Sequence, residues 1–344
     1  MVLLIGDEDV KKAELTPEEV IGAVENAYRQ DGMGFAQDTP RREVRTKGKD
    51  LPHIAPGTES IGQGLSYLEE SKIVVISHAF HFQWHRYLTQ IIDSTNGKTL
   101  AVILREGKPF GTKPGETAVG DLRTGAAAAI GAKYLAKKTI TDVGLIGTGK
   151  VGRASLLCLS KVMNFERVYL HSGRRKDEHS AREMSRILSK DVTATETAND
   201  VAKKAEVLIT ATYSTTPIVD GRWIQPGTHI SGMGSDDPLK AELDPETFRR
   251  SDKIVVDGEK CLTIGEVSNA IKQGALKPTD IYGKIGEIVV GSKRGRESDK
   301  EITIFVSDGT NLQSAGVSLL IYKKVKSLGL GVESSNLETY FYNP

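Results

Sequence analysis

The sequence predicts an α/β protein of two domains, in which a doubly wound parallel sheet is joined to a second, sheet-rich α+β domain. Three observations lead to this prediction. The chain has 344 residues, which is too long for one ordinary domain and suits two. From about residue 123 onward, strand patterns alternate with helix patterns, as in β-α-β units with parallel strands. Before that point, residues 41–103 contain short apolar or alternating runs that are typical of a sheet.

The first half of the chain begins with an expected strand at residues 2–5, followed by a helix. That helix opens at Thr16-Pro17-Glu18-Glu19, where an N-cap residue, a proline in the first turn and two acidic residues stand together. Further strands are expected at residues 72–77, 89–92 and 100–104, with a turn at 94–97 between the last two.

The second half predicts the alternating pattern in order. An alanine-rich helix at 122–135 precedes a buried strand at 142–146, a helix at 153–163 and a second strand at 167–170. A helix at 180–188 and four more strands follow, near 192–194, 207–212, 229–231 and 253–256. The last helix, at 315–328, ends at Gly329-Leu330-Gly331, a glycine-rich stop.

Composition excludes several classes of partner. The formal net charge of +1 gives no electrostatic reason to expect nucleic acid or an anionic membrane as a partner. The two cysteines, Cys158 and Cys261, form neither a disulfide framework nor a metal cluster, which suits a reducing compartment. The apolar run at the N-terminus is too short for a signal peptide or an anchor. We therefore expect a soluble, cytoplasmic protein with no structural metal.

The segment Gly147-Thr148-Gly149-Lys150-Val151-Gly152 carries the strongest chemical signal. It follows an expected strand, precedes an expected helix, and lies in a β-α-β pattern whose next strand comes about 20 residues later, as the dinucleotide motif requires. The glycines allow a tight turn, close approach of the backbone to a pyrophosphate, and packing of the helix on the strand. The start of the helix supplies N–H donors to the phosphates. The segment therefore predicts a Rossmann domain that binds a nicotinamide dinucleotide.

The end of the next strand bears on the choice of cofactor. Sites specific for NAD usually carry an Asp or Glu there, which binds the ribose 2′-hydroxyl. This chain has His171-Ser172-Gly173-Arg174-Arg175-Lys176, with three cations and no carboxylate. Ser172, Arg174 and Arg175 would suit a 2′-phosphate, so we expect NADP(H) to be preferred, with NAD(H) possible. Thr212, at the end of the expected strand 207–212, is also assigned to the cofactor site.

Four stretches resemble the ornithine cyclodeaminase/μ-crystallin family. They are Asp121-Leu122-Arg123-Thr124-Gly125-Ala126-Ala127, the glycine-rich turn at 147–152, residues 227–243 with Gly234-Ser235-Asp236-Asp237-Pro238-Leu239-Lys240-Ala241-Glu242-Leu243, and residues 295–305. The match covers about residues 100–330. The resemblance implies reduction of cyclic imines or imino acids, dehydrogenation of alanine, synthesis of opine-like amines, or conversion of ornithine to proline. It also implies a discontinuous substrate-binding and dimerisation domain, residues 1–122 and 312–344, around a Rossmann domain at 123–311.

The resemblance also suggests roles for individual residues. Asp236 matches the family's catalytic aspartate, and Arg123 matches the arginine that meets the substrate carboxylate or a cofactor phosphate. Lys72 is assigned to the family's active-site lysine, and Arg42 resembles the arginine that holds the substrate carboxylate. His53 stands where the cyclodeaminases carry a glutamate, and we place it in the substrate site. Together these residues suit a small imino or amino acid as the ligand. The resemblance also implies a homodimer.

Three histidines need a separate interpretation. His78, His81 and His85 are spaced so that a helix would place them on one face, where zinc is conceivable. Aromatic residues flank them and no Cys or Glu joins them, so lining of the substrate pocket by Phe80, Phe82, Trp84 and His85 is favoured over a metal site.

Three functions fit the sequence. The first is an NAD(P)H-dependent imine or imino-acid reductase, or an amino-acid dehydrogenase in reverse, with Asp236 as acid and base and with Arg42, Lys72 and Arg123 holding the carboxylate. The second is an ornithine cyclodeaminase, against which the missing glutamate at His53 argues. The third is a non-catalytic, crystallin-like protein that binds NADP(H) or another ligand.

Overall fold

The computed structural model describes residues 1–40, 42–50, 58–82, 85–107 and 117–335. The chain divides into two compact units. The first unit consists of residues 1–123 and 310–344, and the second of residues 124–309. The first unit is therefore built from both ends of the chain, and its boundaries lie within two residues of the expected positions 122 and 312.

The first unit contains one eight-stranded sheet, with the order β16-β1-β7-β6-β5-β4-β2 and with β3 paired to β4. Four long strands, β4 to β7, form an antiparallel meander, whereas β1 runs parallel to β7. Its strands are β1 (Val2–Ile5), β2 (Ala36–Asp38), β3 (Arg42–Lys47), β4 (Glu59–Leu68), β5 (Ile73–His81), β6 (His85–Asp93), β7 (Thr99–Glu106) and β16 (Val332–Ser334).

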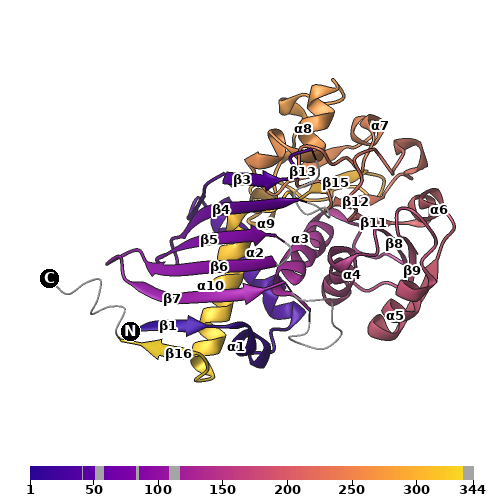
Figure 1. Ribbon diagram of the computed structural model, residues 1–344. Coiled ribbons are helices and arrows are strands. Elements are labelled where there is room, and N and C mark those ends of the chain that lie inside the picture. Colours follow the sequence, from indigo (N-terminus) through magenta and orange to yellow (C-terminus); the bar gives the residue numbers. More distant parts are fainter. Residues whose placement is uncertain (41, 51–57, 83–84, 108–116, 336–344) are drawn as a thin grey trace. The chain divides into compact units, whose positions relative to one another are not determined.

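Two long helices, α2 (Pro17–Gly32) and α10 (Asn311–Ser327), pack together beside this sheet (Figure 1). The N-cap expected at Thr16 is confirmed, because its hydroxyl accepts from the Glu19 amide and the Glu19 carboxylate accepts from the Thr16 amide. A Cβ at Gly316 would lie 2.6 Å from the carbonyl oxygen of Ala23, so glycine permits the close packing of the two helices. A short helix, α1 (Asp7–Lys12), follows β1.

Every strand pair in the second unit is parallel, and its sheet has the order β10-β9-β8-β11-β12-β15-β13-β14. The order reverses between β8 and β11, which is the switch point of a doubly wound sheet. The strands are β8 (Asp142–Ile146), β9 (Arg167–His171), β10 (Asp191–Ala194), β11 (Val207–Thr210), β12 (His229–Gly232), β13 (Lys253–Val256), β14 (Gly283–Lys284) and β15 (Thr303–Val306).

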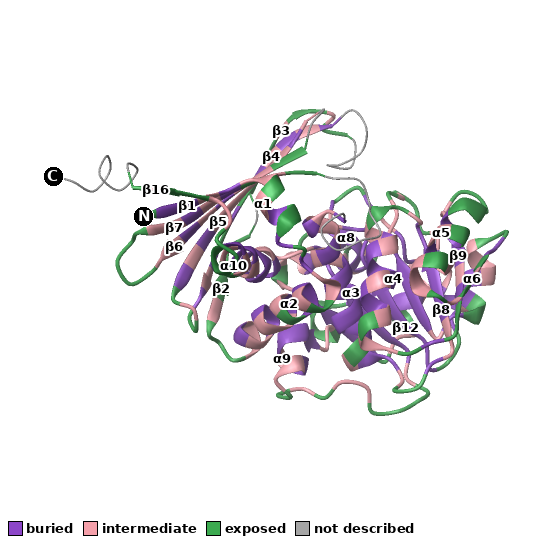
Figure 2. Cartoon of the chain, turned by 90° about the horizontal axis from the view of Figure 1, so that it is seen from below, coloured by how far each residue is buried: buried purple, intermediate pink, exposed green. Residues whose placement is uncertain are grey.

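The helices of this unit pack on a sheet whose inner strands are buried. Every residue of β11, β12, β13 and β15 is buried, and Figure 2 shows β12 in purple. By contrast, β9 and β10, at one edge of the sheet, keep exposed residues. Strands buried on both faces are typically apolar runs, as in Val207-Leu208-Ile209 of β11. The connecting helices are α3 (Val119–Leu135), α4 (Lys150–Val162), α5 (Glu178–Leu188), α6 (Ala198–Lys204), α7 (Pro245–Arg249), α8 (Gly265–Lys272) and α9 (Ile285–Val289). The predicted fold class is confirmed.

Candidate functional site

The glycine-rich turn connects β8 to α4 at the switch point of the parallel sheet. Gly147 has a φ of 105°, and a Cβ there would lie 2.3 Å from the carbonyl oxygen of Ala211. A Cβ at Gly152 would lie 1.9 Å from the carbonyl oxygen of Gly147. By contrast, nothing lies within 4 Å of the Cβ position at Gly149, the N-cap of the 13-residue helix α4. The first and last glycines thus serve packing, and the middle one leaves open space in front of the helix N-terminus.

This open space is where a pyrophosphate would fit. The first N–H groups of α4 have no partner within the helix, and its N-terminus carries a partial positive charge. Lys150 and Val151 form the first turn of α4. The Thr148 hydroxyl donates to the Asp177 carboxylate, which ties the turn to the loop after β9. The residues present therefore fit a dinucleotide phosphate group.

The loop after β9 is built around Ser172. The Ser172 hydroxyl accepts from the amides of Arg174 and Arg175, at 3.2 and 3.0 Å, and donates to the carbonyl oxygen of Arg175 at 2.8 Å. Arg174 and Arg175 are exposed. Lys176 is ion-paired with Glu178 and Glu196, at 3.0 and 3.1 Å. Of the three cations in this loop, the lysine is thus engaged by carboxylates, whereas the two arginines lie at the surface.

Thr212 lies beside the glycine-rich turn. Its Cγ2 is 2.8 Å from the Cβ position of Gly147 and 3.2 Å from that of Gly173. The Thr212 hydroxyl donates to Oε1 of the buried Glu242 at 2.7 Å, and Oε2 of the same carboxyl group accepts from the Gly234 amide at 2.9 Å. Glu242 therefore joins the loops that follow β11 and β12. Burial raises its pKa, and the hydrogen bonds from Thr212 and the charge of Lys240 act in the opposite direction.

Asp236 follows β12 at the same carboxyl edge of the sheet. Its Oδ1 lies 2.6 Å from Nζ of Lys240, and the Lys240 side chain is only 3% exposed, compared with 28% for Asp236. Burial lowers the pKa of Lys240, but the Asp236 charge and hydrogen bond outweigh it, so the lysine pKa is raised. The ammonium is also 4.9 Å from the centre of the Tyr213 ring. Asp236 is thus the carboxylate partner of a buried cation, and sequence reasoning had given Lys240 no role.

The expected carboxylate-binding residues belong to the first unit. Arg123, on α3, donates to Gln313 Oε1, and Gln313 Nε2 donates to the Tyr28 hydroxyl. Arg42 is the exposed first residue of β3 and lies opposite Gln63 of the neighbouring strand β4. Lys72 is an exposed residue of the turn between β4 and β5, with a φ of 51°. His53 lies outside the described residues.

Arg123 has a second arginine nearby. Burial lowers the pKa of Arg105, on β7; Tyr87 and Asp7 raise it, and the Arg123 charge lowers it further. The Arg105 guanidinium lies 5.6 Å from the centre of the Tyr87 ring, and its Nε is buried without a hydrogen-bond partner in the described part of the chain.

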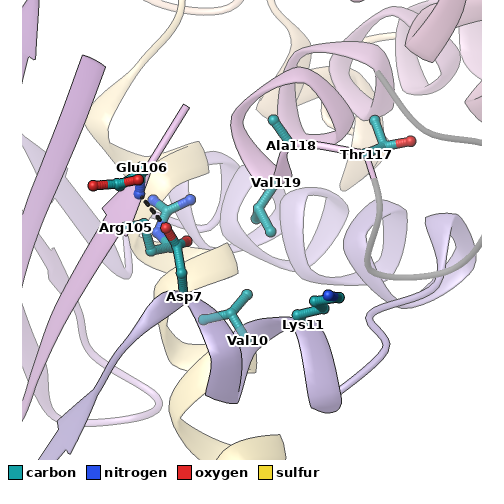
Figure 3. A pocket seen from close by; sticks show the side chains of 8 residues that line it. All are labelled: Asp7, Val10, Lys11, Arg105, Glu106, Thr117, Ala118 and Val119. Atoms are coloured by element: carbon teal, nitrogen blue, oxygen red, sulfur yellow. Dashed lines mark hydrogen bonds between the residues drawn. The ribbon is translucent and has the colours of Figure 1, made fainter. Parts of the chain in front are cut away.

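Figure 3 shows that Arg105 points into a pocket of this unit, where the Asp7 carboxylate accepts from the Glu106 amide at 2.8 Å. The pocket has an empty volume of about 260 Å³ and is lined by Asp7, Val10, Lys11, Arg105, Glu106, Thr117, Ala118 and Val119. The aromatic residues expected to line a pocket are not among these, and Trp84 lies outside the described residues.

The three histidines do not share a helical face, which corrects that interpretation. They lie on β5 and β6, where the period is two rather than 3.6. His81 Nδ1 is 3.3 Å from His85 Nδ1, and His78 Nε2 is 3.2 Å from Gln63 Nε2. Among the described residues, no three His, Cys, Asp or Glu side chains are grouped so that they could hold a metal ion. Within the same residues, no helix is long and apolar enough to cross a membrane.

The fold and this edge define a two-unit protein of the Rossmann class, with a glycine-rich turn at the switch point and an aspartate in the loop after β12, at the same edge of the sheet. Residues 84–329 match the model of the ornithine cyclodeaminase/mu-crystallin family, and the chain belongs to this family.

Three relatives illustrate the similarity. The chain is 30% identical over 333 residues to alanine dehydrogenase of Archaeoglobus fulgidus, covering 96% of this chain and 97% of that protein. The structure of Δ1-pyrroline-2-carboxylate reductase of Thermococcus litoralis, in complex with NADH and L-proline, has a TM-score of 0.82 and 30% identity, covering 97% of this chain and 100% of that one. An archaeal alanine dehydrogenase dimer with bound NAD has a TM-score of 0.82 and 29% identity, covering 97% and 99% of the two chains.

Proposed function

We propose that this protein is a nicotinamide-dependent oxidoreductase that reduces the C=N bond of a small imino acid, or runs the reverse oxidation of an amino acid. The observation that carries this proposal is the placement of the open turn at Gly149 and of Asp236 at one carboxyl edge of the same parallel sheet. Ligands of doubly wound sheets bind at that edge. Relatives at about 30% identity include an alanine dehydrogenase and a pyrroline-2-carboxylate reductase, which both act on C–N bonds.

The residues of the second unit have separate proposed roles in binding the cofactor and in transferring the proton. The amides at the start of α4 and residues 147–152 would hold the pyrophosphate, and Thr212 would lie beside the bound dinucleotide. When bound, the nicotinamide would supply the hydride that reduces the imine carbon. Asp236 would give the imine nitrogen its proton as the hydride reaches the carbon, and it would then lie beside the amine product as a carboxylate. Lys240 would keep Asp236 in place through their ion pair.

The first unit supplies candidates for holding the substrate carboxylate. Arg123 is positioned by Gln313 and offers a forked donor set that suits a carboxylate. Arg42 is retained as a second candidate on the resemblance alone. The exposed turn position of Lys72 gives its expected role no support from the geometry.

We further propose that the protein forms a homodimer through one face of the first sheet. We call this the outer face, and it carries Leu65 of β4 and Leu104 of β7. Leu65 and Leu104 point to this face and are 40% and 49% exposed. Neighbouring strands place further apolar side chains on it at alternating positions: Ile61, Tyr67, Val74, Ile76, Phe80, Leu88, Ile92 and Val102, all of which are half-buried. A face this apolar is typical of a self-association surface. One of the similar structures is a dimer.

The test of the function is an assay of cofactor oxidation by the purified protein. NADH or NADPH is mixed with Δ1-pyrroline-2-carboxylate, or with pyruvate and ammonium, and the absorbance of the reduced nicotinamide is followed. The proposal predicts stoichiometric oxidation of the cofactor together with formation of proline or alanine.

A further inference from the structure

A second carboxyl group, that of Asp308, lies at the same edge of the parallel sheet. Asp308 follows β15, the strand directly beside β12. It is only 3% exposed. Neither of its side-chain oxygens has a hydrogen-bond partner among the described residues. A buried carboxylate without donors is strongly disfavoured, so this group needs an explanation.

The turn that carries Asp308 is held firmly by its neighbours. The Asp257 carboxylate, which follows β13, accepts from the Ser307 hydroxyl at 2.6 Å and from the Gly309 amide at 2.9 Å. On the other side, Lys260 Nζ donates to the backbone oxygen of Asp308 at 2.7 Å. Two segments of the unit, one with Asp257 and one with Lys260, thus fix the backbone around Asp308, whereas its side-chain oxygens have no hydrogen-bond partner in the part of the chain that the structure describes.

The Asp308 side chain is directed toward the loop that carries Asp236. Gly265 has a φ of 77°, and its Cβ position lies 2.8 Å from both carboxyl oxygens of Asp308 and 2.1 Å from the carbonyl oxygen of Ser235. The Asp308 carboxyl group therefore occupies space next to Ser235, the residue before Asp236. Any side chain at Gly265 would displace it.

The surroundings of Asp308 favour its neutral form. Burial is the main cause that raises its pKa well above the usual range. The Lys260 charge lowers the pKa, the charges of Asp257 and Asp236 raise it, and the Cys261 thiol lowers it. Glu266, on α8, also interacts with Asp308, and its own pKa is raised by burial and by Glu242. Asp236 is in the opposite situation, because Lys240 stabilises its ionised form.

We propose that Asp236 and Asp308 form an acid pair with one proton, which rests on Asp308 in the free protein and reaches the substrate through Asp236 in each reduction. This inference rests on the proposed function. Acid–base sites often contain two carboxyl groups whose different environments give them different proton affinities. Asp308 is thus a positioning residue for the proton and acts on the substrate only through Asp236.

The proton balance of the proposed cycle is simple. Reduction of a C=N bond adds a hydride to carbon, and the electron pair of the former π bond takes a proton at nitrogen. Asp308 transfers its proton to Asp236, which passes a proton to the nitrogen and returns to the carboxylate form that Lys240 stabilises. Water then restores the proton on Asp308. In the reverse oxidation, each proton moves in the opposite direction.

Infrared spectroscopy of the full chain labelled with carbon-13 aspartate tests the resting state without any turnover. The proposal predicts a protonated aspartate carbonyl band at neutral pH that is missing in Asp308→Asn and present in Asp236→Asn. In Asp236→Asn the band should disappear at a lower pH than in the wild type, because one negative neighbour is gone. Absence of the band from the wild type at neutral pH, or its persistence in Asp308→Asn, would overturn the proposal.

Kinetics test the proton transfer. We expect Asp308→Asn to bind NADH with unchanged affinity while kcat falls about tenfold or more, and we expect the variant to lack the decline of kcat at high pH that the proposal predicts for the wild type. A variant with the wild-type pH profile and kcat would contradict the role. If Asp308→Asn does not fold, the pH titration of the labelled wild type still decides whether Asp308 is protonated. A wild type that carries the band but reduces no imino acid would refute the proposed function and leave the resting proton on Asp308 standing.

Discussion

Lys240 Nζ lies 2.6 Å from Asp236 Oδ1, and this ion pair joins an almost fully buried ammonium to a partly exposed carboxylate. The lysine thus depends on the aspartate for its charge balance, whereas the aspartate keeps access to solvent. Asp236 also lies at the edge where ligands of parallel sheets bind. Its side chain therefore stabilises the loop and lies where we expect the substrate to react.

The first prediction concerns Asp236→Asn. We expect kcat to fall about a hundredfold or more, as for loss of a group that transfers a proton in the rate-limiting step. NADH affinity should be nearly unchanged, and thermal stability should decrease because Lys240 loses its partner. Asp220→Asn is the control, because it breaks an exposed ion pair with Arg222 and should leave kcat unchanged. Retention of most of the turnover in Asp236→Asn would show that Asp236 is not the acid.

The second prediction concerns the choice of cofactor. Arg174 and Arg175 are exposed in the loop after β9, where the ribose 2′-position is read. We expect the wild type to bind NADP(H) more tightly than NAD(H). Replacing both arginines with alanine should weaken NADP(H) binding about ten- to a hundredfold, the effect of roughly 1.5–3 kcal/mol for a charged hydrogen bond, with little change for NAD(H).

Lys176→Ala is the matched control for these variants. Its ammonium is already engaged by Glu178 and Glu196, so its loss should change both affinities little. Dissociation constants of the wild type that favour NAD(H), as bound in the similar structures, would mean that the two arginines point to solvent.

The third prediction separates two candidates for binding the substrate carboxylate. Arg123→Ala should raise KM for the imino acid about tenfold or more, since it removes a charge-assisted contact of roughly 1.5–3 kcal/mol. Lys72→Ala should change KM and kcat less than about twofold, as expected for an exposed residue in a turn. Steady-state kinetics of the two variants decide the matter. A large loss of activity in Lys72→Ala would return the lysine to the active site.

The fourth prediction concerns assembly. Replacing Leu65 and Leu104 with aspartate places two charges on the outer face of the first sheet and should convert a dimer into monomers. Met33→Asp is the control. Met33 is as exposed as Leu104, at 49%, but it lies at the C-terminal end of α2 and not on the sheet. Sedimentation at micromolar concentration measures the outcome. A wild type that sediments only as a monomer would refute the proposed dimer.

Most strands of the second unit could be predicted because they are short apolar runs with clear turns, whereas β14, β15 and the helices α6 to α9 were not foreseen. The expected strands 142–146 and 253–256 match β8 and β13 to the residue. In the first unit, β4 was not foreseen, because Gly62 and Gly64 weaken its strand pattern. Gly64 is required by packing, since a Cβ there would lie 1.9 Å from the Asn311 side chain. That contact joins segments far apart in the sequence and leaves no local signal.

The part of the site that is formed by residues adjacent in the sequence could be predicted. The turn at Gly147–Gly152 is local, and its residues act together because they are adjacent. Asp308 and Asp236 are brought to one edge only by the order of β12 and β15 in the sheet. A polar residue directly after a buried strand was the available signal for Asp308, in the run Ile304-Phe305-Val306-Ser307-Asp308. The acidic groups that favour its protonated form come from three separate segments, with Asp236, Asp257 and Glu266, and could not be predicted.

The most direct test of the central claim is the change in nicotinamide absorbance when the purified protein meets an imino acid. We expect net oxidation of the reduced cofactor, with one equivalent consumed for each equivalent of amino acid formed. Production of proline and ammonia from ornithine with no net change in the cofactor would contradict it and identify a cyclodeaminase. Cofactor binding with neither reaction would contradict it equally and leave a non-catalytic binding protein.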